Sequence, residues 1–239
     1  MYWLFISDLH LEEQQPELTA FFFQVLHTYR DAERIFILGD WFESWIGDDD
    51  DAPWLQEIVE QLVPFRGKLA FMHGNRDFLI NHQWCDRIGA QLLPETCKLQ
   101  LPNGADALLT HGDLLCTGDH EYLKYRSMVR NPQWQQSILG QPLEQRRMLA
   151  QMLRQKSMLA NSAKSVSIMD VEPSTVDELM QQQAVSILIH GHTHRPAMHQ
   201  RRNYQRWVLG DWTRESTHIL LAHPDGMDLC RHHAGSQLC

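Results

Sequence analysis

The sequence predicts an α/β fold with a helical insertion, and three observations lead to this prediction. In the first third of the chain, short apolar runs alternate with segments of helical periodicity, as they do in βαβ units. In the last third, short apolar runs follow one another across tight turns, which is typical of antiparallel strands. Between these parts lies a helical block of different charge. We therefore expect mixed β-sheets flanked by helices, with a basic helical insertion at about residues 119–170.

The first third is expected to contain three buried strands and three helices in alternation. Pro16 and Pro53 stand where a helix can begin, because proline fits the first helical turn. The expected strands are Tyr2–Ser7, Arg34–Leu38 and Leu69–His73, and the expected helices are Leu18–Tyr29, Trp54–Val63 and Phe78–Ile88. Since parallel strands end at one edge of a sheet, polar residues that follow these strands should meet there.

From about Lys98 the pattern changes to short strands joined by turns. Pro102–Gly104 is typical of a hairpin turn, and Pro224–Gly226 is another turn. The expected strands of this part are Leu108–Thr110, Ser186–Ile189, Arg206–Leu209, His218–Ala222 and Met227–Cys230. We expect the last three to be antiparallel.

The helical block at residues 119–164 reverses the charge of the chain. It holds eight Lys or Arg and three acidic residues, a net charge of +5, whereas the whole chain has −9 and the remainder therefore −14. Such a reversal indicates an insertion with a task of its own. The charge is explained equally well by a helical hairpin with solvated basic faces.

Composition excludes several classes of protein. With 43% hydrophobic and 21% charged residues, the chain is neither disordered nor collagen-like. Its net charge of −9 argues against nucleic-acid binding through a basic surface. Five cysteines without a C-x-x-C motif favour a reducing compartment over a disulfide framework. The sequence has no signal-peptide pattern and no apolar run of about 20 residues, so we expect a cytoplasmic protein.

Five short motifs place metal-binding residue types directly after expected strands. They are Asp8-x-His10, Gly39-Asp40, Gly74-Asn75, His111-Gly112-Asp113 and Gly191-His192-Thr193-His194. Each motif alone is typical of a turn or a helix cap, but five in this order predict a metal centre. Carboxylate, amide and imidazole ligands suit Mn²⁺, Fe²⁺ or Zn²⁺. Two neighbouring cations need a bridging anion, and Asp40 is the natural candidate.

These motifs, in this order, resemble those of the calcineurin-like metallophosphoesterase superfamily. The resemblance covers nearly the whole chain outside residues 119–164 and implies a sandwich of mixed β-sheets flanked by helices. It implies that one metal ion is held by Asp8, His10, Asp40 and His194. It implies that the second is held by Asp40, Asn75, His111 and His192. A hydroxide that bridges the two ions would be the nucleophile.

One departure from the superfamily pattern bears on the reaction. Where the superfamily usually has Gly-Asn-His, this chain has Gly74-Asn75-Arg76, followed by Asp77. Arginine cannot act as a general acid near neutral pH, but it can hold phosphate oxygens through two parallel hydrogen bonds. This residue therefore suits a leaving group that needs no proton, such as a phosphate ester released from a diphosphate.

The segments Gly74–Phe78 and Gly39–Asp49, with the basic insertion, are similar to one branch of the superfamily, the UDP-2,3-diacylglucosamine diphosphatases of lipid A biosynthesis. The resemblance implies two Mn²⁺ ions and attack on the phosphorus next to uridine, giving UMP and 2,3-diacylglucosamine 1-phosphate. It assigns catalysis to Asp40, Asn75 and Arg76. It assigns substrate binding to Asn75, Arg76, Asp119, Ser157, Asn161, Lys164 and His192. Positions 157, 161 and 164 share one helix face, although Ser157 and Asn161 could simply face solvent.

A diacylated substrate would be anchored in a membrane. An acidic protein is repelled by anionic lipid unless it presents a basic, apolar face, and the insertion offers both characters. We therefore expect peripheral association with the inner face of the cell inner membrane. Two alternatives stay open: a soluble nucleotide pyrophosphatase or dinucleotide polyphosphatase on the same fold, and a scaffold that has lost its metals. The scaffold is disfavoured because every ligand position is filled by a competent residue.

Overall fold

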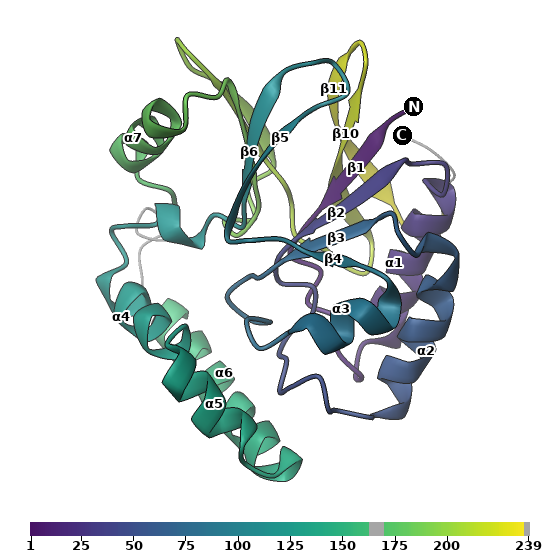
Figure 1. Ribbon diagram of the computed structural model, residues 1–239, viewed down its shortest axis with the longest axis vertical. Helices are drawn as coiled ribbons and strands as arrows, with labels where there is room; N and C mark the ends of the chain where they lie inside the picture. Colours follow the sequence, from purple (N-terminus) through teal and green to yellow (C-terminus); the bar gives the residue numbers. More distant parts are fainter. Residues whose placement is uncertain (163–169, 237–239) are drawn as a thin grey trace.

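The computed structural model describes residues 1–162 and 170–236, without the side chains of residues 160–162. Its described residues form two mixed β-sheets (Figure 1). The first sheet has the strand order β11-β10-β1-β2-β3-β4. Strands β1 to β4 are parallel, and β10 and β11 add to the β1 edge as an antiparallel hairpin. Its strands are β1 (Trp3–Ile6), β2 (Arg34–Leu38), β3 (Leu69–Met72), β4 (Gln91–Leu92), β10 (Ser216–His223) and β11 (Gly226–His233).

The second sheet has the order β5-β6-β7-β9-β8. Its strands are β5 (Thr96–Gln100), β6 (Asp106–Thr110), β7 (Ile187–His190), β8 (Ala197–Gln200) and β9 (Gln205–Val208). Strand β9 pairs parallel with β7, with Ile189 opposite Trp207. The expectation that the strand at Arg206–Leu209 is antiparallel is therefore wrong for its pairing with β7. Strand β8, which was not expected, supplies the antiparallel partner of β9.

Helices cover the outer faces of both sheets. The two sheets pack face to face around a buried cluster that includes Phe5, Phe36, Leu109 and Ile189. A second cluster joins the other face of the first sheet to three helices, and a third joins the second sheet to one helix. Three of these helices are α1 (Pro16–Thr28), α2 (Pro53–Leu62) and α3 (His82–Ile88), and the fourth is α7 (Pro173–Gln183). The expected sandwich of mixed sheets flanked by helices is confirmed.

Helix α3 begins four residues later than predicted. The backbone N–H of Ile80 donates to the Asp77 carbonyl, which forms a turn where Phe78–Ile88 was expected to be helical throughout. The carboxylate of Asp48 accepts the N–H groups of Asn81 and Trp84, at the start of the helix. A distant carboxylate thus satisfies the first amide groups of α3 and defines its beginning.

The described residues of the basic block form three helices beside the sandwich (Figure 1). They are α4 (His120–Val129), α5 (Pro132–Leu139) and α6 (Leu143–Ser162). Val129 is buried in the cluster beneath α1 to α3, and the Trp134 ring lies 6.2 Å from that of Phe78. Apolar contacts therefore attach these helices to the sandwich.

Ion pairs neutralise most of the positive charge of this block. Within the described part of the chain, six of its eight basic residues contact carboxylates. Five of the six reach acids outside the block; the pairs are Arg126 with Glu95 and Asp113, Arg130 with Glu95, Arg146 with Asp49, Arg147 with Asp50, and Arg154 with Glu43. The charge reversal between insertion and body therefore serves to dock one on the other. No described helix is both long and apolar enough to cross a membrane.

Candidate metal centre

The seven predicted ligands lie where the carboxyl ends of the two sheets meet. Asp8, Asp40 and Asn75 follow β1, β2 and β3 of the first sheet, and His111 and His192 follow β6 and β7 of the second. His10 and His194 stand two residues after Asp8 and His192 on the same loops. The loops are joined by backbone hydrogen bonds: Asp8 N donates to Gly39 O, His10 N to Asp40 O, and Gly191 N to His111 O, at 2.9–3.0 Å.

Five of these residues have left-handed backbone conformations. The φ angles are 55° at Asp8, 52° at His10 and Asp40, 68° at His192 and 55° at His194. Among the described residues, Ala184 is the one other non-glycine residue with positive φ. Such conformations are disfavoured for residues with a Cβ and are found at functional sites, where the surrounding structure imposes them. The backbone thus singles out the residues that the sequence motifs predicted.

Glycines allow the ligand loops to approach closely. A Cβ atom on Gly74 would lie 2.1 Å from Oδ1 of Asp40, and one on Gly191 would lie 2.3 Å from Oδ2 of Asp8. These distances are far below any van der Waals contact. Both glycines are therefore required by packing against a candidate ligand.

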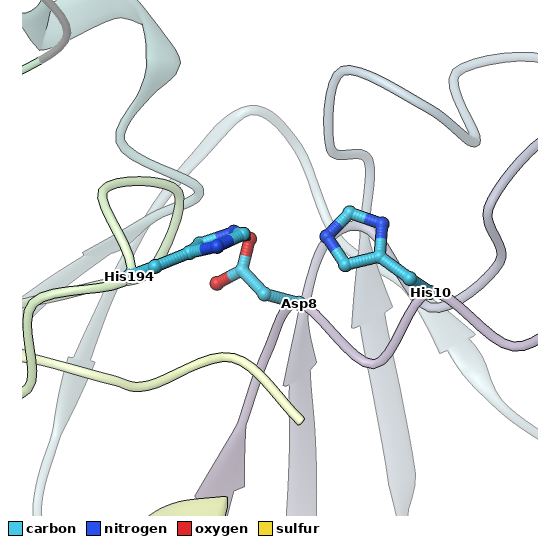
Figure 2. A group of neighbouring side chains, drawn as sticks. All are labelled: Asp8, His10 and His194. Carbon is cyan, nitrogen blue, oxygen red and sulfur yellow. The ribbon is translucent and has the colours of Figure 1, made fainter. Parts of the chain in front are cut away.

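One group of candidate ligands is formed by Asp8, His10 and His194 (Figure 2). One ligand atom from each of the three lies within 4.8 Å of the others, and the two imidazole rings flank the carboxylate. Oδ2 of Asp8 accepts hydrogen bonds from the Ser7 hydroxyl and the His192 amide, at 2.6 and 2.9 Å. Oδ1 lies 3.4 Å from Nε2 of His194 and accepts no hydrogen bond within the described residues. A buried carboxylate oxygen that faces imidazole nitrogens fits a cation.

The second group surrounds Oδ1 of Asn75. This amide oxygen lies 3.0 Å from Nε2 of His111 and 2.8 Å from Nδ1 of His192. His111 donates its Nδ1–H to the Leu38 carbonyl at 2.8 Å, so the neutral ring has its lone pair on Nε2. In that neutral form Nε2 and the amide oxygen both present lone pairs, and a cation between them fits this arrangement.

Asp40 lies between the two groups. Its Oδ2 is 3.9 Å from Nε2 of His10, and its Oδ1 is 3.8 Å from Nε2 of His111. The backbone N–H of Arg76 donates to the same Oδ1 at 2.8 Å. Asp40 is therefore placed as a bridging carboxylate would be, with one oxygen directed to each group.

The pKa values of these residues reflect burial opposed by charge. Burial would raise the pKa of Asp8, but the imidazole of His194 holds it well below its usual range. In turn, Asp8 overcomes the effect of burial on His194 and raises its pKa to about 9. Burial and the neighbouring His111 lower the pKa of His192 to about 4. His192 is therefore neutral at pH 7 and has a lone pair to offer to a metal ion.

A cavity of about 700 Å³ leads from this centre to the insertion. Asn75, Arg76 and His192 line it, together with residues of α4, α5 and α6. Asp119 and Ser157, both expected to bind substrate, also line it. The carboxylate of Asp119 caps α4 as well, because it accepts the Tyr122 N–H at 3.1 Å. The remaining two expected contacts, the side chain of Asn161 and the whole of Lys164, lie outside the described part of the chain.

Three acidic residues near the site had no assigned role in the sequence analysis. The buried carboxylate of Asp77 accepts the N–H groups of Trp41 and Gly74, both at 2.7 Å, and so joins two ligand loops. Asp113 accepts hydrogen bonds from the Tyr122 hydroxyl and Arg126 Nε, which attach α4. The third, Glu43, contacts His10. Asp113 stands in a ligand motif, and Asp77 and Glu43 follow one closely, but partners distant in sequence give all three their roles.

Comparisons with known proteins agree with this geometry. Residues 1–196 match the family model of calcineurin-like phosphoesterases. A protein from Cellvibrio japonicus named UDP-2,3-diacylglucosamine hydrolase is 47% identical over 87% of this chain and 90% of its own length. A protein of the same name from Klebsiella pneumoniae is 43% identical over 95% and 97%.

A solved structure shares the fold at low sequence identity. It is described as a novel archaeal phosphodiesterase and superposes with a TM-score of 0.53, covering 98% of this chain and 99% of that one, at 10% identity. This likeness shows the fold alone. The family match and the close relatives, together with the clustered ligands, show that the chain belongs to the calcineurin-like phosphoesterases, and within them to the family whose members are named UDP-2,3-diacylglucosamine hydrolase.

Proposed function

We propose that this chain hydrolyses the diphosphate bond of UDP-2,3-diacylglucosamine, in lipid A biosynthesis, and releases UMP and 2,3-diacylglucosamine 1-phosphate. One observation carries the proposal: candidate ligands line the same cavity as apolar side chains of the insertion. A diphosphate suits the candidate ligands and Arg76, and acyl chains suit the apolar lining. The names of the close relatives agree with this substrate.

In this proposal the seven clustered residues hold two divalent ions, which we assign as Mn²⁺. The donor set has no thiolate and accepts Mn²⁺, Fe²⁺ or Zn²⁺ alike, and Mn²⁺ is the choice that the resemblance to the diphosphatases implies. When bound, such ions supply Lewis-acid activation of water and neutralise charge on phosphate oxygens. Arg76 adds a fixed positive charge and two hydrogen-bond donors on the wall of the cavity. It stabilises charge on the diphosphate without supplying a proton.

The apolar lining of the cavity supports a substrate that carries acyl chains. Ile46, Trp134, Ile138, Leu149 and Leu153 all line it. Burial contributes about 0.8 kcal/mol for each CH₂ group, so a buried acyl chain adds several kcal/mol to binding. A UDP-sugar without acyl chains would bind without this contribution to the free energy.

The proposed contact with the membrane is an exposed stripe on α6. Met148 and Met152 are one helical turn apart and are 54% and 67% exposed, with Lys156 one turn further. Because ion pairs engage most of the basic side chains of the insertion, these methionines are its better candidates for contact with anionic lipid. We propose that the enzyme works as a peripheral protein at the cytoplasmic face of the inner membrane. Flotation with anionic vesicles should weaken for Met148→Ser combined with Met152→Ser, but not for Met198→Ser on β8.

The test of the function is product analysis with defined substrates. The purified protein should release UMP from UDP-2,3-diacylglucosamine in the presence of Mn²⁺, and Arg76→His should reduce the rate. Hydrolysis of UDP-sugars or dinucleoside polyphosphates, with the diacylated substrate left intact, would instead support a soluble nucleotide pyrophosphatase. The absence of any Mn²⁺-stimulated activity would instead support a scaffold that has lost its metals.

A further inference from the structure

Glu43 is held beside His10 because two ligand loops run next to each other. The His10 N–H donates to the Asp40 carbonyl and the Leu11 N–H to the Trp41 carbonyl, and the Glu43 N–H returns to the Leu11 carbonyl, at 2.9–3.0 Å. Leu11 and Phe42 form a parallel bridge in the same segment. The backbone of Glu43 is therefore fixed relative to His10.

The side chain of Glu43 contacts one ring nitrogen of His10. Oε2 of Glu43 lies 3.1 Å from Nδ1 of His10, and the Glu43 side chain is 13% exposed. The other ring nitrogen, Nε2, lies 3.9 Å from Oδ2 of Asp40. Glu43 and the candidate metal centre are thus on opposite nitrogens of one imidazole ring.

The second carboxylate oxygen of Glu43 faces the insertion. Nε of Arg154, on α6, forms an ion pair with Oε1 of Glu43. Each oxygen of the carboxylate therefore has its own partner, one from a ligand loop and one from the insertion. This ion pair limits the rotation of the Glu43 side chain.

We propose that Glu43 is a positioning residue for His10. Its carboxylate, 3.1 Å from Nδ1 of His10, favours the proton on that nitrogen and so keeps the lone pair on Nε2, the nitrogen nearest Asp40. A carboxylate on the far nitrogen of a ligating histidine typically raises metal affinity or activity 10- to 100-fold, at order of magnitude. Arg154 holds Glu43 in this position and so connects the insertion to a metal ligand. This inference rests on the proposed function, because it concerns the same metal centre.

Glu43 also lines the cavity, so a direct contact with substrate is the competing explanation. The two explanations differ in what they predict. Loss of a substrate contact raises KM and leaves metal affinity unchanged. Loss of a positioning residue lowers metal affinity when no substrate is present.

The experiment measures Mn²⁺ binding to metal-free protein by electron paramagnetic resonance of free Mn²⁺, without substrate. Glu43→Ala should weaken binding at the site that contains His10 by about 10- to 100-fold. Glu43→Gln should recover most of the affinity, because its amide oxygen can still accept the Nδ1–H. Glu57→Ala, an exposed acid on α2, is the matched control and should bind as the parent does. If Glu43→Ala does not fold, Glu43→Met removes the acceptor and keeps the side-chain length.

The outcomes separate this inference from the proposed function. If the parent protein binds Mn²⁺ and the variants without an acceptor bind equally well, the positioning role is wrong. A raised KM with unchanged Mn²⁺ affinity would make Glu43 a substrate contact instead. A parent protein that binds no Mn²⁺ would overturn the proposed metal centre, and this inference with it.

Discussion

The replacement of Gly74 by alanine tests whether close approach of the ligand loops is essential. The added Cβ would lie 2.1 Å from Oδ1 and 2.3 Å from the backbone N of Asp40. Ordinary contact begins at 3.4 Å, so the two loops must separate by about 1.3 Å. Displacement of a reacting group by about 1 Å can lower a rate by about 10²-fold, which corresponds to about 2.7 kcal/mol. We therefore expect Gly74→Ala to lose at least about 10²-fold in kcat.

The same replacement should lower thermal stability, because overpacking in a close-packed site costs about 1–3 kcal/mol. In a chain of this size that corresponds to a decrease in Tm of about 2–12 °C. Gly118→Ala is the matched control, because a Cβ there meets no atom within 4 Å and the φ angle of Gly118 is not positive. The assay is UMP release from the diacylated substrate, with Tm measured on the same samples. A Gly74→Ala variant within about tenfold of the Gly118→Ala rate would refute the reasoning.

Four further predictions follow from individual residues and from the metal. Asp40→Ala should abolish turnover without loss of the circular dichroism spectrum, because the carboxylate between the two ligand groups is removed; more than about a tenth of the parent rate would contradict this. Arg146→Ala should accelerate amide hydrogen exchange over α5 and α6, because Arg146 bonds both Asp49 oxygens and the Ile46 carbonyl; unchanged exchange would contradict it. Chelation by EDTA should lower Tm, because an ion that binds the folded state stabilises it; an unchanged Tm would count against a bound metal. His232→Phe should raise Tm, because His232 is buried and neither ring nitrogen has a hydrogen-bond partner within the described residues.

The last of these has a defined dependence on pH. Burial lowers the pKa of His232 from its ordinary value of 6.5, so the unfolded chain binds more protons than the folded one near and below that pH. The parent protein should therefore lose stability as pH falls below about 6.5. The phenylalanine variant lacks this contribution, so its advantage in Tm should be larger at pH 5.5 than at pH 8. An advantage that is constant across this range would show that His232 does not contribute to the acid sensitivity.

The candidate ligands could be predicted from sequence because each one depends on a local pattern. An apolar run of four or five residues followed by Asp, Asn or His specifies both a strand and the residue at its end. Asp8, Asp40 and Asn75 are examples, and the parallel register of β1, β2 and β3 brings them to one edge. The left-handed conformations of Asp8 and Asp40 were not predictable, because tertiary contacts impose them against the preference of the residue type.

Features that depend on distant partners were missed or misread. The charge of the insertion can be counted from the sequence, but the acids that pair with it cannot be identified there: Arg146 and Asp49 are 97 residues apart. The late start of α3 involves Asp48, 33 residues before Asn81, beside the local cap that the Asn81 side chain provides. Strand β8 escaped prediction because it is short and alternates between half-buried and exposed side chains.

The strand order of the first sheet also has a consequence for synthesis of the chain. Strand β1 lies between β2 and β10, so the earliest strand to leave the ribosome keeps one edge unpaired until residues 216–223 have emerged. An unpaired apolar edge invites association with other chains, and contacts so distant in sequence form slowly. Nascent chains stalled before β10 should therefore aggregate readily or depend on chaperones, whereas release of the last hairpin closes this edge.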